Sequence, residues 1–487
     1  MEKQYRCSRT IMQAVVLVGL FAVVGLGVSC SNMLTDLAAL KTVTAVETSD
    51  AKSMTAFDFY AADNVGVLLR DIEAVIDQDQ ETIVFAIPFP VFDSELAPRF
   101  VSTGVGVRVN GVLQTSGTSK QSFADAVDYT VSASDGTTRT YQASAVPEAV
   151  LSRIMNDTPV PNEYYKFYMS TALAADENYF AAFNAWEVRF FDLSNPHSPE
   201  VVADRWVVSG GDRQPQAITS IGDYVFLAQT SGWFTVFDWS DRNDPAVVYS
   251  GAISAGQNFD IADNGVDTVF IANTSNNTFL AVSVADPENP GVIYTDDQLN
   301  GFSAGVAYYD GHAYAAGFGG HIYAYEFSEG AWTRTAASVD GIAAVANASR
   351  LAVIGNHLYV HKYAADEFDI FSLADPAAPV HAGTLTLDAN VSTYMRPVQS
   401  GSHMYVGTDG GVLEVYDVTA PGSPVLDHEL TDALAEYLFD EELYETQGGV
   451  LGMTVFPGRG LFSIVSINQN DSAIRQISFV HDPVFYQ

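Results

Sequence analysis

The feature that most constrains the fold is a segment at residues 222–245 that recurs about every 45 residues. It contains an apolar strand at 224–228, a short turn, and a second strand at 234–238 that is rich in β-branched and aromatic residues. Equivalent first strands begin at residues 179, 224, 269, 314, 359 and 405, separated by 45, 45, 45, 45 and 46 residues, and a weaker copy begins near Phe462. Such a period is typical of a β-propeller. The sequence therefore predicts a propeller of about seven blades over residues 162–487.

Pairs of prolines follow the second strand in several repeats. They occur as Pro-x-x-Pro at 196–199, 287–290, 376–379 and 421–424. Because proline has no amide donor, it is excluded from central strands and tolerated at an edge. A Pro-x-x-Pro turn before the outermost strand therefore suits a blade, and it also discourages pairing with another chain. The alternative is a series of ordinary surface turns.

The second strands of three repeats end in aspartate, at residues 188–192, 234–238 and 413–417. In this respect residues from about 160 to 487 resemble the LVIVD-repeat family of bacterial surface propellers. Three copies depart from the pattern, with Ser283, Glu326 and Ser372 in place of the aspartate. The resemblance implies the propeller fold, and in that family the motif residues build the blades.

The chain is strongly acidic. Its formal net charge is −37, from 59 acidic against 22 basic residues. Such a chain repels nucleic acid and anionic membrane surfaces, so no nucleic-acid partner is expected. The charge is explained either by solubility in a salty or crowded medium or by binding of cations or of a basic partner. The two cysteines, Cys7 and Cys30, lie within the first 30 residues, which argues against a disulfide framework or a thiolate metal site.

The N-terminus resembles a bacterial lipoprotein signal peptide. Basic residues precede an apolar stretch at 11–28, and small residues lead to Cys30. The resemblance implies that residues 1–29 are removed and that Cys30 receives a lipid anchor, palmitate included, which attaches the protein to a membrane. The alternatives are an uncleaved anchor helix and a plain secretory signal. Residues 30–54 are polar and are interpreted as a tether.

Residues 55–147 are predicted to form a small antiparallel sandwich. Asn110-Gly111 separates two apolar strands and indicates a tight hairpin, and Asp135-Gly136 indicates a second. The segments 100–104, 107–112 and 127–136 resemble an Ig-like domain of bacterial surface lipoproteins, which implies a spacer or adhesive module. Residues 148–161 are expected to be a linker.

The propeller carries no sequence motif of an enzyme or a metal site. It has no sialidase Asp-box, nucleophile elbow, zinc-protease helix or calcium loop. We therefore predict no catalytic residue, metal ligand or cofactor. The candidate partner-binding residues are Trp186, Trp233, Trp239, Tyr437, Glu441 and Glu442. The alternative role for the tryptophans is packing between blades. The last three residues lie in an acidic insert at 427–447, which has the pattern of an amphipathic helix and interrupts the repeat.

Together these features predict an all-β chain, with a small Ig-like β-sandwich followed by a seven-bladed β-propeller. The leading hypothesis is a non-catalytic, lipid-anchored protein of the bacterial cell envelope, facing the periplasm or the exterior, whose propeller rim binds a protein or a glycan. One alternative is an enzyme, a hydrolase or lyase acting on extracellular polysaccharide, which requires two carboxyl groups facing each other at ~5–10 Å. A third hypothesis is a structural role in envelope assembly. Ring closure is expected to use a strand at 163–170.

Overall fold

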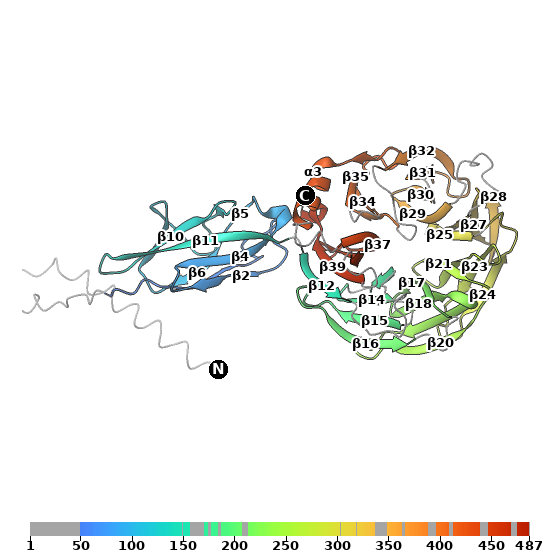
Figure 1. The fold of residues 1–487 in the computed structure, drawn as a ribbon, viewed down its shortest axis with the longest axis horizontal. Coiled ribbons are helices and arrows are strands. Elements are labelled where there is room, and N and C mark those ends of the chain that lie inside the picture. Colours follow the sequence, from blue (N-terminus) through green and yellow to red (C-terminus); the bar gives the residue numbers. More distant parts are fainter. Residues whose placement is uncertain are drawn as a thin grey trace, which may run out of the picture.

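The computed structural model describes residues 49–148, 150–155, 170–173, 177–183, 187–206, 213–301, 303–317, 319–336, 348–362, 366–387, 396–408, 413–438, 447–468 and 475–486. An elongated N-terminal domain lies beside a ring of small sheets (Figure 1). The all-β class and the propeller are confirmed. The segments 1–29 and 30–48, with Cys30, lie outside the described residues.

The N-terminal domain consists of two main sheets that share one apolar core. One sheet has the order β2-β1-β6, the other has the order β3-β4-β11-β10-β7-β8, and β5 pairs with β9. The strands are β1 (Met54–Phe59), β2 (Ile72–Glu73), β3 (Val75–Asp77), β4 (Thr82–Pro88), β5 (Glu95–Leu96), β6 (Arg99–Ser102), β7 (Gly106–Val109), β8 (Val112–Leu113), β9 (Gln121–Ser122), β10 (Val127–Ser132) and β11 (Thr138–Glu148). The rings of Phe59 and Phe85, from opposite sheets, lie 4.6 Å apart at the centre of this core.

Both predicted hairpins of this domain are present. Asn110 and Gly111 have φ angles of 48° and 80°, as a type I′ turn requires, and they connect β7 to β8. The second hairpin joins β10 to β11 through Gly136, whose φ is 89°. The prediction of a wholly antiparallel sandwich was wrong, because β11 pairs with β4 in parallel. Six strands lie between β4 and β11 in sequence, and one of them, β6, belongs to the other main sheet, so β4 and β11 meet through a crossover rather than a hairpin.

The ring contains seven four-stranded antiparallel sheets among the described residues. In the first six, the strands follow the chain order from the channel outward. Their bounds are β13 (Ser170–Leu173), β14 (Tyr179–Phe183), β15 (Glu187–Asp192), β16 (Glu200–Trp206); β17 (Pro215–Ile221), β18 (Tyr224–Gln229), β19 (Trp233–Asp238), β20 (Ala246–Ala252); β21 (Asn258–Asp263), β22 (Thr268–Asn273), β23 (Thr278–Ser283), β24 (Gly291–Asp296); β25 (Ser303–Tyr309), β26 (His312–Gly317), β27 (Ile322–Ser328), β28 (Ala331–Ala336); β29 (Ala348–Ile354), β30 (His357–Lys362), β31 (Glu367–Ser372), β32 (Val380–Thr386); and β33 (Val398–Ser400), β34 (His403–Gly407), β35 (Leu413–Asp417), β36 (Val425–Leu426).

The seventh blade closes the ring with a strand from the beginning of the propeller. Its chain-order strands are β37 (Gln447–Phe456), β38 (Leu461–Asn468) and β39 (Arg475–His481), and its outermost strand is β12 (Val150–Met155). Residues 150–155 therefore belong to the ring, although the sequence analysis assigned them to the linker. The strand expected to close the ring, 163–170, lies outside the described residues except for Ser170, which begins β13.

The tyrosine that begins a repeat and the Pro-x-x-Pro turn of the next repeat meet at two interfaces between blades. The hydroxyl of Tyr314 in blade four donates to the carbonyl of Pro376 in blade five, at 2.8 Å. The hydroxyl of Tyr359 in blade five donates in the same way to Pro421 in blade six, at 2.6 Å. At the next interface Tyr405 donates to Asp482, at 2.7 Å. In blades four, five and six, the tyrosine that begins the repeat therefore connects its blade to the following blade.

Replacing Tyr359 with phenylalanine tests this interpretation. The Tyr359 side chain is buried, so Tyr359→Phe should lower the free energy of unfolding of the ring by about 1 kcal/mol, the usual contribution of one hydrogen bond. Urea unfolding followed by tryptophan fluorescence measures this change, since all five tryptophans lie at residue 186 or later. The control is Tyr309→Phe, at a partly exposed tyrosine of β25. Equal stability of the two variants would contradict the assigned role.

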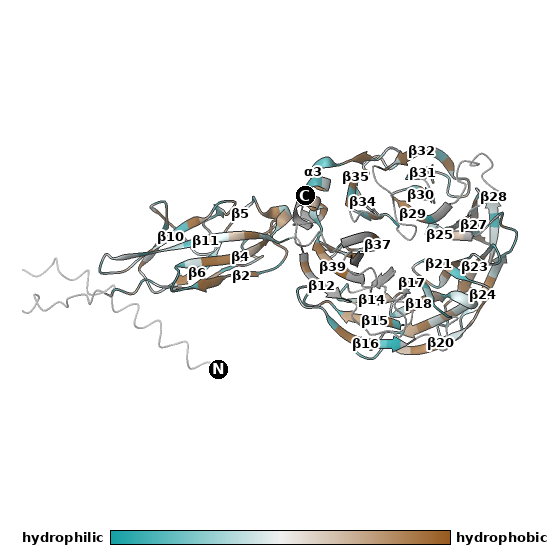
Figure 2. Cartoon of the chain, in the orientation of Figure 1, coloured by the Kyte–Doolittle hydropathy of each residue, from teal (hydrophilic) through white to brown (hydrophobic). Residues whose placement is uncertain are grey.

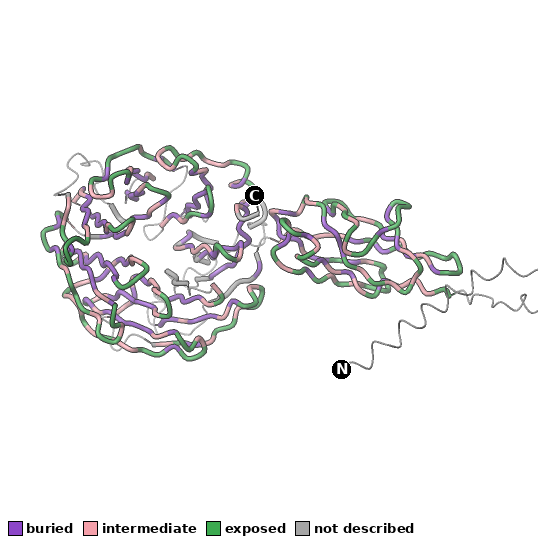
Figure 3. The backbone as a smooth tube through the Cα atoms, turned by 180° about the vertical axis from the view of Figure 1, so that it is seen from behind, coloured by how far each residue is buried: buried purple, intermediate pink, exposed green. Residues whose placement is uncertain are grey.

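Apolar residues of successive blades fill the spaces between sheets. Buried residues concentrate within the ring and exposed ones follow its outer circumference (Figure 3). Apolar strands alternate with hydrophilic turns in both domains (Figure 2). Trp239 is one of the largest fully buried side chains, and its ring lies 5.0 Å from that of Phe190 in the preceding blade. It therefore fills a blade interface.

The acidic insert begins with the predicted amphipathic helix. Helix α3 (His428–Leu438) follows the short strand β36, and Asp427 accepts a hydrogen bond from the Leu430 amide at its N-terminus. Leu430 and Leu434 are buried against the sixth blade, whereas Glu429 and Asp432 are exposed. The helix thus covers the outside of a blade whose fourth strand has only two residues.

A charged cluster joins the two domains. Glu148, at the end of β11, accepts from Arg70 at 2.7 Å, and its carboxylate also contacts His197 at 2.9 Å and His481 at 3.1 Å. His197 lies in the outer turn of blade one and His481 ends β39. Beside this cluster Phe89, in the 3-10 helix η1 (Phe89–Val91), packs into the apolar core of the last two blades near η3 (Pro483–Tyr486).

Candidate functional site

The central channel of the ring contains a cavity of about 580 Å³. Six innermost strands or their approaches line it: β17, β21, β25, β29, β33 and β37. The volume lies within the range of small-molecule sites, roughly 300–1,000 Å³. The walls are mixed, because they contain aliphatic side chains together with Gln216, Thr219, Thr454 and four acidic or basic side chains. The cavity is therefore large enough and polar enough to receive a small polar molecule.

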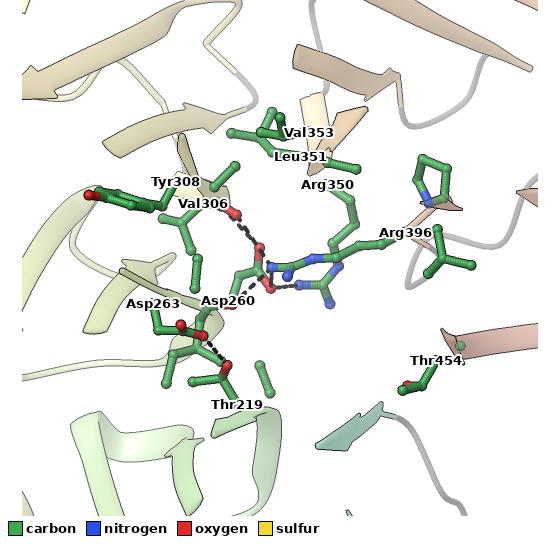
Figure 4. Close-up of a pocket in the computed structure, with 18 of the residues that line it drawn as sticks. Thr219, Asp260, Asp263, Val306, Tyr308, Arg350, Leu351, Val353, Arg396 and Thr454 are labelled. Carbon is green, nitrogen blue, oxygen red and sulfur yellow. Dashed lines mark hydrogen bonds and ion pairs between the residues drawn. The ribbon is translucent and has the colours of Figure 1, made fainter. Parts of the chain in front are cut away.

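The centre of the cavity wall is an aspartate bound by two arginines (Figure 4). Asp260 on β21 is 2.7 Å from the Nη1 atom of Arg350 on β29, and its same oxygen contacts Nη2 of Arg396, just before β33. The second oxygen of Asp260 accepts from the amide of Val306 on β25, at 3.0 Å. This cluster therefore connects blades three, four, five and six across the channel.

The geometry of the inner strands explains how these charges reach the channel. The pairing register shifts between Asn258 and Asp260 on β21, and between Ala348 and Arg350 on β29. Such irregularities turn a side chain away from its regular direction. The equivalent positions on β17 and β25 are Ala217 and Gly305, so small residues occupy the place that carries a charge in the other two blades.

A second carboxyl group, Asp263, lines the same cavity. It accepts hydrogen bonds from the hydroxyl of Thr219 and from the amide of Gly265, the latter at 2.9 Å. Burial raises the pKa of Asp263 above its usual value, and the bond from Thr219 opposes this shift only in part. Asp260 differs from Asp263 in its partners, because its two oxygens are bound by two arginines and by a backbone amide.

Trp233 lies at the rim, where a polar network surrounds it. The guanidinium of Arg213 stacks 3.5 Å from the centre of the indole, whose N–H donates to Ser250 at 2.8 Å. The Asn258 amide donates to the Trp233 carbonyl at 3.1 Å, and Asn273 donates to Asn258 at 3.0 Å. These buried amides hold the rim loops of blades two and three in place.

The rim network reaches the cavity on one side and faces away from the domain junction. Gln257 donates to Gln216, which lines the cavity, at 3.2 Å. Because antiparallel strands alternate in direction, the third strands of all blades run the same way, from one face of the ring to the other. Trp233 is the first residue of such a strand, β19. His481 ends such a strand, which places Trp233 on the face opposite to the junction.

The other predicted contact residues are distributed differently. Trp239 is fully buried, so its side chain packs in the core and does not reach the rim. Trp186, Glu441 and Glu442 lie outside the described residues, and the side chain of Tyr437 in α3 is also not described. The sequence analysis missed Asp260, Asp263, Arg350 and Arg396. Asp260 and Arg350 could have been found by aligning the repeats, because neighbouring repeats have alanine or glycine at the same inner-strand position.

Two features are absent from the described part of the chain. No three His, Cys, Asp or Glu side chains of these residues come together as metal ligands do. No helix among these same residues is long and apolar enough to span a membrane.

Comparison with known proteins finds one family model that matches part of the N-terminal domain. Residues 66–145 match the family described as "SGBP, N-terminal", a domain of surface glycan-binding proteins of the cell envelope. No curated protein sequence matches this chain.

Similar solved structures include Sqt1 from Chaetomium thermophilum, at 12% identity and a TM-score of 0.44, covering 62% of this chain and 79% of that chain. Another is a chain of the Mitotic Checkpoint Complex, at 10% identity and a TM-score of 0.48, covering 68% and 91%.

Proposed function

We propose that this protein is a non-catalytic, surface glycan-binding protein that is lipid-anchored through Cys30 and presents its propeller to polysaccharide. The observation that carries the proposal is the match of residues 66–145 to the N-terminal domain of surface glycan-binding proteins. The rim of blades two and three supports it, because an aromatic ring among amide and hydroxyl groups suits a sugar, which has apolar faces and many hydroxyls. In this proposal the N-terminal domain is an Ig-like spacer and residues 30–54 are the tether.

Binding to a panel of soluble polysaccharides tests this function. The purified protein should be retarded in native gels that contain the recognised polysaccharide, and the retardation should saturate with its concentration. The panel should include neutral and acidic polymers, with bovine serum albumin as the non-binding reference. If no polymer retards the protein, and release of reducing ends is also absent, the glycan-binding proposal fails. Release of reducing ends would instead favour the hydrolase alternative.

The anchor is tested separately by replacing Cys30 with serine. The wild-type chain expressed in a bacterial host should fractionate with membranes and incorporate labelled palmitate. Cys30→Ser should lose the label and leave the membrane fraction, because one thiol carries the acyl chains. Cys7→Ser is the matched control and should keep both properties. Label that persists in Cys30→Ser would refute the anchor.

Replacing Trp233 with alanine should weaken polysaccharide binding by roughly 5- to 10-fold, which corresponds to about 1–1.4 kcal/mol of lost stacking. The expected change is in affinity, since Trp233 is only partly buried and lies at the rim. Isothermal titration with the recognised polymer measures it. The matched control is Phe327→Ala, which removes an aromatic ring that is 56% exposed on another blade. Equal affinities of the two variants would exclude Trp233 from the binding surface.

A further inference from the structure

The cavity in the channel has an unusual balance of charge for so acidic a chain. Among its described lining residues, the acidic and basic side chains are Asp260, Asp263, Arg350 and Arg396. Two guanidinium groups thus converge on one carboxylate, in a protein whose formal net charge is −37. Arg350 alone is sufficient to neutralise Asp260, so the position of Arg396 on the same carboxylate requires an explanation.

The two arginines differ in their access to the cavity. The side chain of Arg350 is only 5% exposed, and it also lies over the ring of Phe259, 4.4 Å from the centre of the ring. The side chain of Arg396 is 34% exposed, although its Nη2 atom is bound to Asp260 and to the carbonyl of Ile261 at 3.1 Å. Arg350 therefore neutralises Asp260 within the wall, while Arg396 presents part of its guanidinium to the space.

The remaining carboxyl group does not compensate Arg396 by direct contact. Asp263 accepts hydrogen bonds from Thr219 and Gly265, and burial raises its pKa although these bonds and the charge of Arg396 oppose the shift. His361 adds no charge at neutral pH, because burial and the nearby charge of Arg350 lower its pKa to about 4. Two carboxyl groups and two guanidinium groups therefore balance in number, and the side chain of Arg396 is the more accessible of the two arginines. A carboxylate that enters the cavity can form charge-assisted hydrogen bonds with the exposed part of the Arg396 guanidinium.

We propose that the channel cavity binds the carboxylate of an acidic sugar residue, with Arg396 as the group that meets it. This inference rests on the proposed glycan-binding function and assigns it a ligand class. A guanidinium matches the two oxygens of a carboxylate. Gln216, Thr219 and Thr454 line the same space and supply hydrogen-bonding groups for sugar hydroxyls. The rim network at Trp233 adjoins the cavity through Gln216, so a longer chain could contact both.

The test compares two forms of one oligosaccharide. Trigalacturonic acid and its fully methyl-esterified form have the same sugar rings and differ in the carboxylate charges. Isothermal titration of the full chain should give at least 10-fold tighter binding of the acid. Arg396→Gln should abolish this preference, and Arg396→Lys should keep part of it, because the charge remains but the paired donors are lost. Arg108→Gln, at an exposed arginine of the N-terminal domain, makes the same change in net charge and should bind as the wild type does.

Each outcome decides the inference. Equal affinity for acid and ester, no binding of either, or an unchanged preference in Arg396→Gln would overturn it. If Arg396→Gln does not fold, as judged by its thermal transition, the preference in Arg396→Lys decides, and an unchanged preference there would also count against the inference. Binding of acetate without binding of the sugar acid would identify a simple anion site and would likewise overturn it. Retardation by neutral polysaccharides would then leave the proposed glycan-binding function intact.

Discussion

Replacing Asp260 with asparagine should lower the free energy of unfolding of the ring by about 3–5 kcal/mol, because it leaves two guanidinium groups in the channel without their counter-charge. Asp260 is 1% exposed and contacts residues of three other blades, so solvent cannot replace it. Urea unfolding of the full chain, followed by tryptophan fluorescence, reports on the ring alone. The N-terminal domain at residues 49–148 contains no tryptophan.

Two further variants separate the electrostatic effect from a general one. Asp297→Asn, at an exposed aspartate in the loop after β24, should leave stability within about 0.5 kcal/mol of the wild type. The double variant Asp260→Asn with Arg396→Gln should be more stable than Asp260→Asn alone, because it removes one of the two unpaired charges. Two results would show that the cluster does not hold the blades together. One is a decrease below about 1 kcal/mol in the free energy of unfolding of Asp260→Asn, and the other is a decrease in the double variant that equals the sum of the two single decreases.

The second large effect is expected at the domain junction, where Glu148→Gln should cost about 3 kcal/mol by removing the carboxylate from a mostly buried charged cluster. Glu148 ends β11, and the closing strand β12 begins two residues later. Loss of its contacts with Arg70, His197 and His481 should therefore weaken the ring as well as the junction. Tryptophan fluorescence again measures the effect, and Glu73→Gln, at an exposed glutamate of β2, is the control.

The pH dependence of this effect follows from the groups that face Glu148. Burial alone would raise the pKa of the Glu148 carboxyl, but the bonds from His197 and His481 and the charge of Arg70 hold it well below the usual 4.5. A carboxyl with a lowered pKa stabilises the fold above its unfolded pKa and loses this contribution as the pH falls toward the folded value. The difference in stability between wild type and Glu148→Gln should therefore shrink below pH 4.5. A difference that stays constant from pH 6 to pH 3 would contradict the assigned role.

Sequence periodicity was sufficient to predict the blades because the second and third strands are buried on both faces. These strands therefore appear in the sequence as uninterrupted apolar runs. The tyrosines and prolines that recur beside them form contacts between blades in the structure. The Asn110-Gly111 hairpin was predictable for a similar reason, since its positive φ angles are a local property. The helix in the acidic insert was also visible in the spacing of its leucines.

The candidate site could not be predicted in this way. Asp260, Arg350 and Arg396 are far apart in the chain and come from three blades, and none of them belongs to a local motif. The tryptophans show the same limit, because Trp233 and Trp239 flank one strand, yet one ring reaches the rim and the other fills an interface. The closing strand was misplaced because pairing of β12 with β39 depends on where two distant segments meet.

Local chemistry along the chain was therefore enough to establish the repeating blades, the hairpins and the amphipathic helix, since each depends on residues within a few tens of positions. The closure of the ring, the parallel pairing of β4 with β11 and the charged cavity were decided only in three dimensions. Closing a ring brings the inner strands of separate blades around one channel, and the charges that meet there have no short-range pattern to announce them.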